Sequence, residues 1–130
     1  MIVDTTFLID ILRRDRVAIA RLRALENQGE TLWVPTPAIY ELWDGVERGD
    51  RPDEEAKKID ALLRNYTVIA FDAAAAAAAG RLAGELARRG TVLKNIDVMI
   101  GGIALETGNP VLTRNAKDFE KIPGIEIVAY

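Results

Sequence analysis

Short, β-branched apolar runs alternate with helix-length segments along the chain, and this alternation constrains its fold more than any other feature. Strands are expected at residues 1–4, 32–34, 67–70, 111–113 and 125–128. Helices are expected at residues 6–12, 17–27, 36–48, 53–63, 73–89 and 96–106, with a loop or short turn at 114–119. Strands that alternate with helices favour a parallel sheet wrapped by helices on both faces. The sequence therefore predicts a three-layer α/β/α fold with a mostly parallel central sheet.

Polar residues mark several of the expected helix starts. Thr36 precedes Pro37, a pair that is typical of an N-cap hydroxyl followed by proline at the first helical position. Asp53 and Asp72 are expected to cap the next two long helices. We interpret Asp72 as a cap and not as part of a functional site.

Size and composition indicate one globular domain that covers residues 1–130. Hydrophobic residues make up 49% and charged residues 28% of the 130-residue chain, which is typical of globular proteins. No apolar run reaches the roughly 18 residues that a membrane span needs. The first ten residues contain two aspartates and no basic segment, unlike a signal peptide. We therefore expect a cytoplasmic protein without membrane contacts.

The chain contains no cysteine and no histidine. This absence excludes disulfides, thiolate nucleophiles, the usual zinc sites and any histidine general base. Carboxylates, hydroxyls, amides, lysine and arginine are the groups that remain for chemistry. Such oxygen ligands suit hard cations, and we therefore expect Mg²⁺ or Mn²⁺ as the cofactor.

Four acidic residues that are far apart in the sequence are expected at one edge of the sheet. Asp4 ends the first strand, and Asp118 lies in the loop after the fourth. Glu41 lies one turn into the helix after the second strand, and Asp97 lies in the first turn of the last long helix. Open α/β sheets bind ligands beyond the carboxyl ends of their strands. We therefore predict these four as the catalytic and metal-binding residues.

A cluster of this kind requires a compensating cation. Two carboxylates about 4 Å apart repel each other by roughly 4 kcal/mol at an effective dielectric constant near 20. A divalent metal would relieve this repulsion and also activate water for attack on a phosphodiester. If four of the 20 acids belong to the site, 16 remain against 17 Lys and Arg residues. The net charge of −3 therefore does not exclude a nucleic-acid substrate.

Each acid alone also has an ordinary structural explanation. An aspartate after a strand is often a turn or cap residue, and Asp4 alone is compatible with such a role. Glu41 alone is compatible with a solvated helix position, and Asp97 alone with a helix N-terminal acid that complements the dipole. The joint placement of the four carries the prediction.

Four motifs in this order resemble a PIN domain of the VapC toxin type, essentially over the whole chain. They are Ile2–Asp10 with Asp4 and Thr6, Glu41–Val46, Asn95–Ile100 with Asp97, and Leu112–Phe119 followed by Ile122-Pro123-Gly124. The resemblance gives supporting positions at the rim to Thr6, Thr113 and Asn115. It implies a metal-dependent endoribonuclease that is held inactive by a cognate antitoxin, and it implies a homodimer.

The resemblance also bears on the basic residues and on two departures from the family pattern. Arg13, Arg14, Lys94 and Arg114 are expected near the rim, where they could bind RNA phosphates. Gly101 and Gly102 replace part of an alanine-rich helix, at a cost of roughly 0.5–1 kcal/mol each. We expect very close packing of this helix on the sheet in compensation, with local mobility of the metal site as the alternative. Thr6 stands where serine or asparagine is common.

Three other functions compete with a toxin ribonuclease. A phosphotransfer domain also places acids at strand ends, but its Asp-x-Asp or acidic-pair patterns are absent here. A PIN nuclease in housekeeping RNA processing and a catalytically silent PIN binding module both remain open at this stage. The presence of all four acids argues against the silent module.

Overall fold

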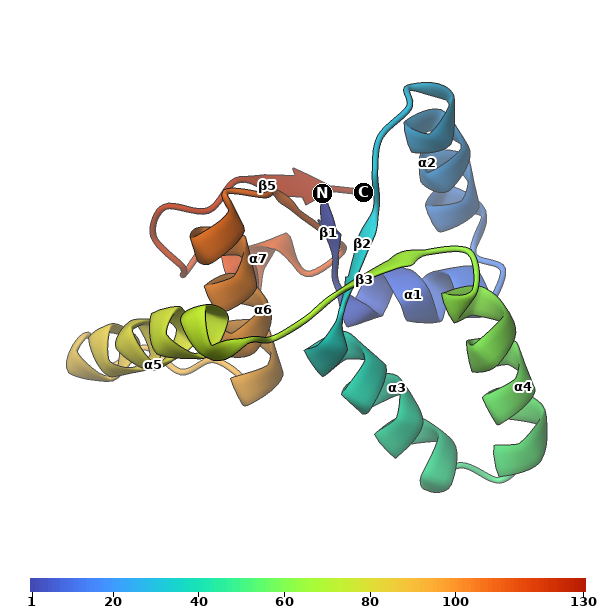
Figure 1. Ribbon diagram of the computed structural model, residues 1–130, viewed down its shortest axis with the longest axis horizontal. Coiled ribbons are helices and arrows are strands. Elements are labelled where there is room, and N and C mark those ends of the chain that lie inside the picture. The colour runs from blue at the N-terminus through green and yellow to red at the C-terminus, as the bar shows by residue number, and fades with distance from the viewer.

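The computed structural model of the protein describes residues 1–130 and contains a five-stranded sheet (Figure 1). The strands are β1 (Ile2–Val3), β2 (Trp33–Pro35), β3 (Thr67–Ile69), β4 (Val111–Thr113) and β5 (Ile127–Ala129). The helices are α1 (Thr5–Leu12), α2 (Arg16–Asn27), α3 (Thr36–Glu47), α4 (Pro52–Leu63), α5 (Ala73–Arg88), α6 (Asn95–Thr107) and α7 (Ala116–Phe119). None of these helices combines the length and the apolar character that a membrane span needs.

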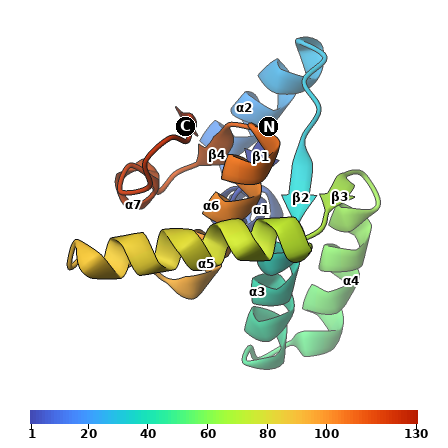
Figure 2. The ribbon, with the colours of Figure 1, turned by 60° about the vertical axis from the view of Figure 1, so that its left-hand side comes forward.

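The sheet has the strand order β3-β2-β1-β4-β5, and every neighbouring pair is parallel. The predicted α/β architecture is therefore confirmed. In Figure 1, α5, α6 and α7 lie to the left of β1 and β2, whereas α1, α3 and α4 lie to the right. Figure 2 shows α5 crossing in front of α6 and α3 running beside α4. Helices thus cover the sheet on both sides.

The central strands β1 and β4 are the most deeply buried part of the sheet. Ile2, Val3, Val111 and Leu112 are fully buried within a core of 24 hydrophobic residues. Strands with helices on both faces are apolar along their whole length and do not alternate with polar residues. The first polar residues after these strands therefore lie at the edge of the core.

Two of the three predicted helix caps differ in the structure. Asp72 caps α5 as expected, because its carboxylate accepts from the Ala75 backbone N–H at 2.9 Å. Thr36 was expected as an N-cap but is already the first residue of α3, and its hydroxyl accepts from the Phe71 backbone N–H at 2.9 Å. Asp53 lies in the first turn of α4 and does not cap it. The Thr36 hydroxyl therefore binds a backbone N–H that is 35 residues away in the sequence, and it does not cap the helix as predicted.

Other elements begin or end close to their predicted bounds. The expected loop or turn at residues 114–119 contains the short helix α7, which buries Phe119 completely. The last strand was expected at residues 125–128 and is observed at Ile127–Ala129. β5 is the edge strand beside β4, and α7 contacts β5.

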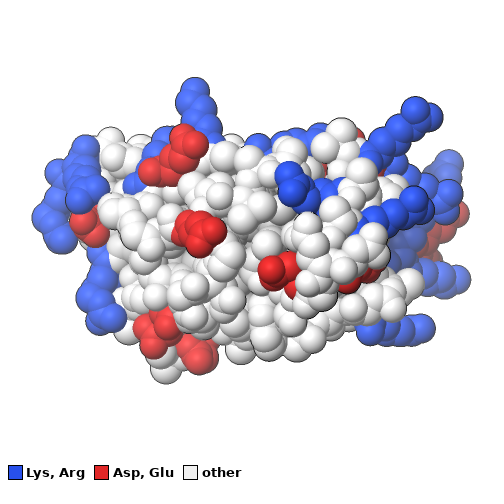
Figure 3. Space-filling model, turned by 90° about the horizontal axis from the view of Figure 1, so that it is seen from above, with Lys and Arg blue, Asp and Glu red and all other residues white.

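Charged side chains are unevenly distributed on the surface. On the face shown in Figure 3, Lys and Arg side chains gather mainly toward the two ends, and separate acidic side chains stand in a mostly uncharged middle. This face therefore offers no continuous basic surface to a polyanion.

Gly102 allows α6 to approach α5 very closely, and Gly101 leaves room for the side chain of Ile122. A Cβ atom on Gly102 would lie 2.8 Å from the Ala75 carbonyl oxygen and 2.7 Å from the Ala79 Cβ. A Cβ on Gly101 would lie 2.6 Å from the Ile122 Cδ1, at the end of a side chain. The close packing predicted for this helix is therefore present, but its main partner is the alanine-rich helix α5 and not the sheet. Small residues on both helices make this contact.

Substitution of Gly102 tests the close contact between α5 and α6. Gly102→Ala should lower the free energy of unfolding by about 1–3 kcal/mol, because the new methyl group meets backbone atoms that cannot move aside. Gly80→Ala on α5 is the matched control, since nothing lies within 4 Å of its Cβ position. It should raise stability by roughly 0.5–1 kcal/mol through helix propensity alone. Denaturant titration measures both, and equal effects of the two substitutions would contradict this account.

Candidate active site

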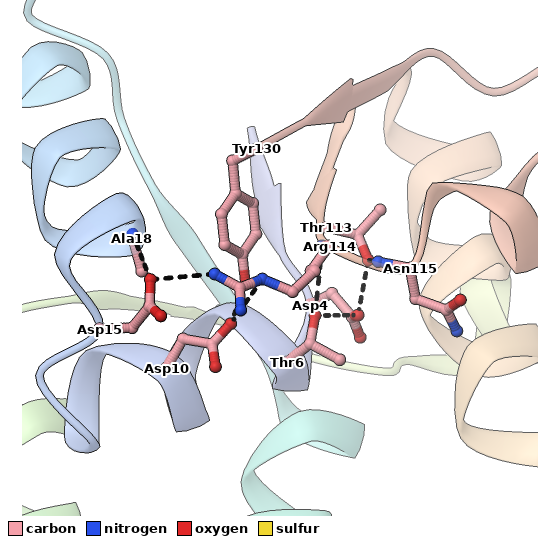
Figure 4. Close-up of polar contacts among 9 residues, drawn as sticks. All are labelled: Asp4, Thr6, Asp10, Asp15, Ala18, Thr113, Arg114, Asn115 and Tyr130. Carbon is pink, nitrogen blue, oxygen red and sulfur yellow. Dashed lines mark hydrogen bonds and ion pairs between the residues drawn. The ribbon is translucent and has the colours of Figure 1, made fainter.

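The pairing of β1 with β4 places Asp4 beside Thr113. The Asp4 backbone N–H donates to the Leu112 carbonyl at 2.9 Å, directly after the last paired residues of the two strands. The Asp4 Oδ2 then accepts from the hydroxyls of Thr6 and Thr113, each at 2.8 Å (Figure 4). Its Oδ1 accepts from the Thr5 backbone N–H at 2.7 Å and so caps α1. Asp4 is only 2% exposed, and three donors fix its orientation.

Asp97 is the second buried carboxylate and lies in the first turn of α6. Its Oδ2 is buried and has no hydrogen-bond partner. Burial in the first place, and then the negative charges of Asp4, Glu41 and Asp118, together raise the pKa of Asp97 to about 6, while Lys94 opposes them. All four predicted acids therefore belong to one electrostatic neighbourhood.

Glu41 and Asp118 are half-buried at the border of this neighbourhood. Glu41 lies on α3 and lines a groove between α1, α3 and α4. Asp118 accepts from the Asn115 side-chain amide at 2.6 Å and pairs with Lys121 at 3.2 Å. These two hydrogen bonds, that from Asn115 first, lower the pKa of Asp118. The pKa values of Asp97 and Asp118 are thus shifted in opposite directions.

The geometry fits a hydrated divalent cation better than a closed carboxylate cage. No three acidic side chains lie close enough together to hold one metal ion directly. Mg²⁺ usually keeps several of its waters and binds through one or two carboxylates. The unpartnered Asp97 Oδ2 is a free ligand of the right chemistry, and the acids around it are all oxygen donors. The binding of a metal by all four acids stays a prediction.

The three predicted supporting residues all contact the acids or each other. Thr6 and Thr113 donate to Asp4, as described. The Asn115 backbone N–H donates to the Thr113 hydroxyl at 2.9 Å, and its side chain donates to Asp118. The segment 113–115 therefore links two carboxylates that come from opposite ends of the sequence.

The four predicted RNA-binding residues lie in different surroundings. Arg13 is exposed and lines the groove that contains Glu41. Lys94 is exposed at the start of α6 and acts electrostatically on Asp97 and Asp118. Arg14 lines a separate groove between α1 and α4. Arg114 is already paired with two carboxylates, so Arg13 and Lys94 are the residues best placed for phosphates beside the acids.

Three residues of this region were not predicted from the sequence. Asp10 and Asp15 form the ion pairs of Arg114, at 3.2 and 2.9 Å. The Tyr130 hydroxyl donates to Asp10 at 2.7 Å. Asp10 falls within the first motif and was a detectable candidate for that reason. No local signal connects Tyr130 with a residue 120 positions earlier.

Comparison with known proteins gives the family. The PIN domain family matches residues 1–125. The tRNA(fMet)-specific endonuclease VapC of Shigella flexneri is 31% identical over 122 residues, which cover 94% of this chain and 91% of the relative. The enzyme of the same name from Salmonella typhimurium is 36% identical over 89 residues, which cover 68% of this chain and 67% of the relative.

Solved structures agree with this sequence similarity. DNA-bound VapBC from Salmonella typhimurium superposes with a TM-score of 0.87 at 30% identity and covers 98% of this chain and 96% of that one. VapBC2 from Rickettsia felis, bound to a DNA fragment from its promoter, has the same fold, with a TM-score of 0.91 at 22% identity over 99% of this chain and 97% of that one. The chain therefore belongs to the PIN domain family, within its VapC group.

Proposed function

We propose that this protein is a metal-dependent endoribonuclease and the toxin of a toxin–antitoxin pair. The observation that carries the proposal is the buried, unpartnered Asp97 Oδ2, which is surrounded by the charges of Asp4, Glu41 and Asp118. Such an arrangement is costly unless a cation compensates it. The names of the VapC relatives support RNA as the substrate.

Each group of the chain has a separate task in this proposal. Asp97 and Asp4 would hold Mg²⁺ or Mn²⁺, with Glu41 and Asp118 binding through the ion's water molecules. The bound metal would lower the pKa of a water molecule and stabilise negative charge on the phosphate. Thr6 and Thr113 keep Asp4 in one orientation. Because histidine is absent, a carboxylate accepts the proton of the attacking water, and Arg13 and Lys94 bind the neighbouring phosphates.

A protein partner fits the groove beside Glu41. This groove lies between α1, α3 and α4, and most of its lining is apolar: Ile9, Leu12, Leu42, Val46 and Ile59, with Arg13, Glu41, Gly45 and Glu55. We propose that an antitoxin segment lays an apolar face here and places an arginine against the acids. Arginine suits this position because its planar fork binds carboxylates and keeps its charge when buried. The homodimer and the cytoplasmic location stay predictions.

The pH dependence of stability tests the electrostatic cost of the charged Asp97 side chain. Its pKa rises from 3.8 to about 6 on folding, so the folded state binds more protons than the unfolded state between these values, and stability falls as pH rises through this window. On going from pH 4 to pH 7, the free energy of unfolding of Asp97→Asn should rise by about 1–3 kcal/mol relative to that of the unmodified protein. Denaturant titrations in EDTA at both pH values measure this change. A difference that is independent of pH would contradict it.

Cleavage of RNA tests the metal site directly. Purified protein should cut tRNA(fMet) or total RNA with Mg²⁺ or Mn²⁺, and EDTA should abolish the reaction reversibly. Asp4→Asn and Asp97→Asn should each abolish cleavage, because each removes a charge that binds the metal. Asp72→Asn is the control and should keep full activity, since asparagine caps a helix about as well as aspartate. Cleavage that survives EDTA would overturn the metal-dependent mechanism.

The groove can be blocked without disturbing the fold. Gly45 is exposed, lines the groove and has nothing within 4 Å of its Cβ position. Gly45→Gln should weaken binding of the protein encoded by the neighbouring small open reading frame by about tenfold or more. The new side chain would occupy the groove and prevent the partner from burying its apolar face there. Gly80→Gln, at an equally open helix position on α5, should leave this affinity unchanged. Equal affinities of the two variants in calorimetric titration would place the partner elsewhere.

A further inference from the structure

We propose that Arg114 is a positioning residue, which ties the segment 113–115 to α1 and the start of α2 and thereby holds Asp4 and Asp118 in place for the metal. The proposal gives Arg114 a different role from RNA contact. It rests on the proposed function, since it concerns the same metal site.

The guanidinium of Arg114 is held from three sides (Figure 4). Its Nε lies 3.2 Å from Asp10 Oδ2, and its Nη2 lies 2.9 Å from Asp15 Oδ1. It lies against the ring of Tyr130, with 5.1 Å between the guanidinium carbon and the ring centroid. Two carboxylates thus occupy Nε and Nη2, two of the three nitrogens with which an arginine binds a phosphate, and one face of the guanidinium lies against an aromatic ring.

The residues that hold Arg114 are themselves fixed. Asp15 Oδ1 also caps α2, because it accepts from the Ala18 backbone N–H at 2.9 Å. Asp10 accepts from the Tyr130 hydroxyl at 2.7 Å. The Tyr130 ring stands edge-on to the fully buried Phe7, with 5.1 Å between centroids. Arg114 therefore binds three side chains whose positions are fixed by the start of α2 and by the core.

The two neighbours of Arg114 in the chain contact the acids of the site. Thr113 donates to Asp4 Oδ2, and Asn115 donates to Asp118 Oδ2. The Arg114 backbone N–H also points at the Thr6 hydroxyl, at 3.4 Å, and this hydroxyl donates to Asp4. A shift of the Arg114 backbone would therefore move the donors of both carboxylates. Hydrogen-bond partners that orient metal ligands commonly control metal affinity.

Binding of Mn²⁺ to the full chain distinguishes the two roles of Arg114. Mn²⁺ affinity is measured by electron paramagnetic resonance of the free ion, and kcat and KM are measured with RNA at several salt concentrations. Arg114→Gln should weaken Mn²⁺ binding by about tenfold or more and lower kcat, with KM and its salt dependence nearly unchanged. Arg114→Lys should recover part of the affinity, because an ammonium keeps the charge but cannot span both carboxylates as the fork does.

Two further variants complete the test. Tyr130→Phe removes only the hydroxyl that fixes Asp10 and keeps the ring contacts, so it should give a smaller loss of Mn²⁺ affinity in a folded protein. Arg89→Gln is the matched control: Arg89 is an exposed arginine that pairs with Glu85 at 2.7 Å within one helical turn. It should bind Mn²⁺ like the unmodified protein.

The opposite results would overturn the proposal. If Arg114→Gln binds Mn²⁺ normally while KM rises and the salt slope falls by about one, Arg114 contacts RNA phosphate directly. If Arg114→Gln does not fold, unchanged Mn²⁺ affinity in both Tyr130→Phe and Arg114→Lys overturns the positioning role. An unmodified protein that binds no Mn²⁺ overturns the proposed function and this inference with it. Normal Mn²⁺ binding by all the Arg114 and Tyr130 variants overturns this inference alone.

Discussion

The parallel pairing of β1 with β4 determines where the candidate active site of this protein lies. It joins the second and third residues of the chain to residues 111 and 112, and the next residue of each strand is polar. Asp4, directly after β1, and Thr113, the last residue of β4, therefore lie side by side and bind each other at the edge of the core. A shift of one residue in this register would turn the wrong side chains toward the core and separate the two.

The fold gives its two buried aspartates, Asp4 and Asp97, different hydrogen-bond environments. Asp4 accepts three hydrogen bonds, whereas one oxygen of Asp97 accepts none. Three hydrogen bonds hold the Asp4 carboxylate in one orientation, whereas burial without a partner disfavours the charged form of Asp97. One position is therefore organised in advance, and the other stores unfavourable energy that a ligand can release. Such a division is common where a protein sacrifices stability for binding.

The sequence predicts the local features of this protein well and the distant ones poorly. The alternation of strands and helices predicted the parallel sheet, and the Asp72 cap followed from its place before an alanine run. Thr36 was assigned wrongly because its partner, Phe71, comes from another strand–helix connection. Arg114 was predicted to bind RNA phosphates, and its ion pairs were missed for the same reason: Asp10, Asp15 and Tyr130 lie close to it only in the folded chain. The spacing of residues along the chain does not indicate such contacts.

The position of β1 in the middle of the sheet has a consequence for the time at which the site first exists. β1 pairs on one side with β2 and on the other with β4, although the register partners Ile2 and Val111 lie far apart in the sequence. Contacts between residues 109 positions apart, such as that of Thr113 with Asp4, are slow to form because a long loop must close first. The acids at residues 4 and 118 therefore come together only when β4 has paired with β1, and a chain in which this pair has not formed has no assembled site.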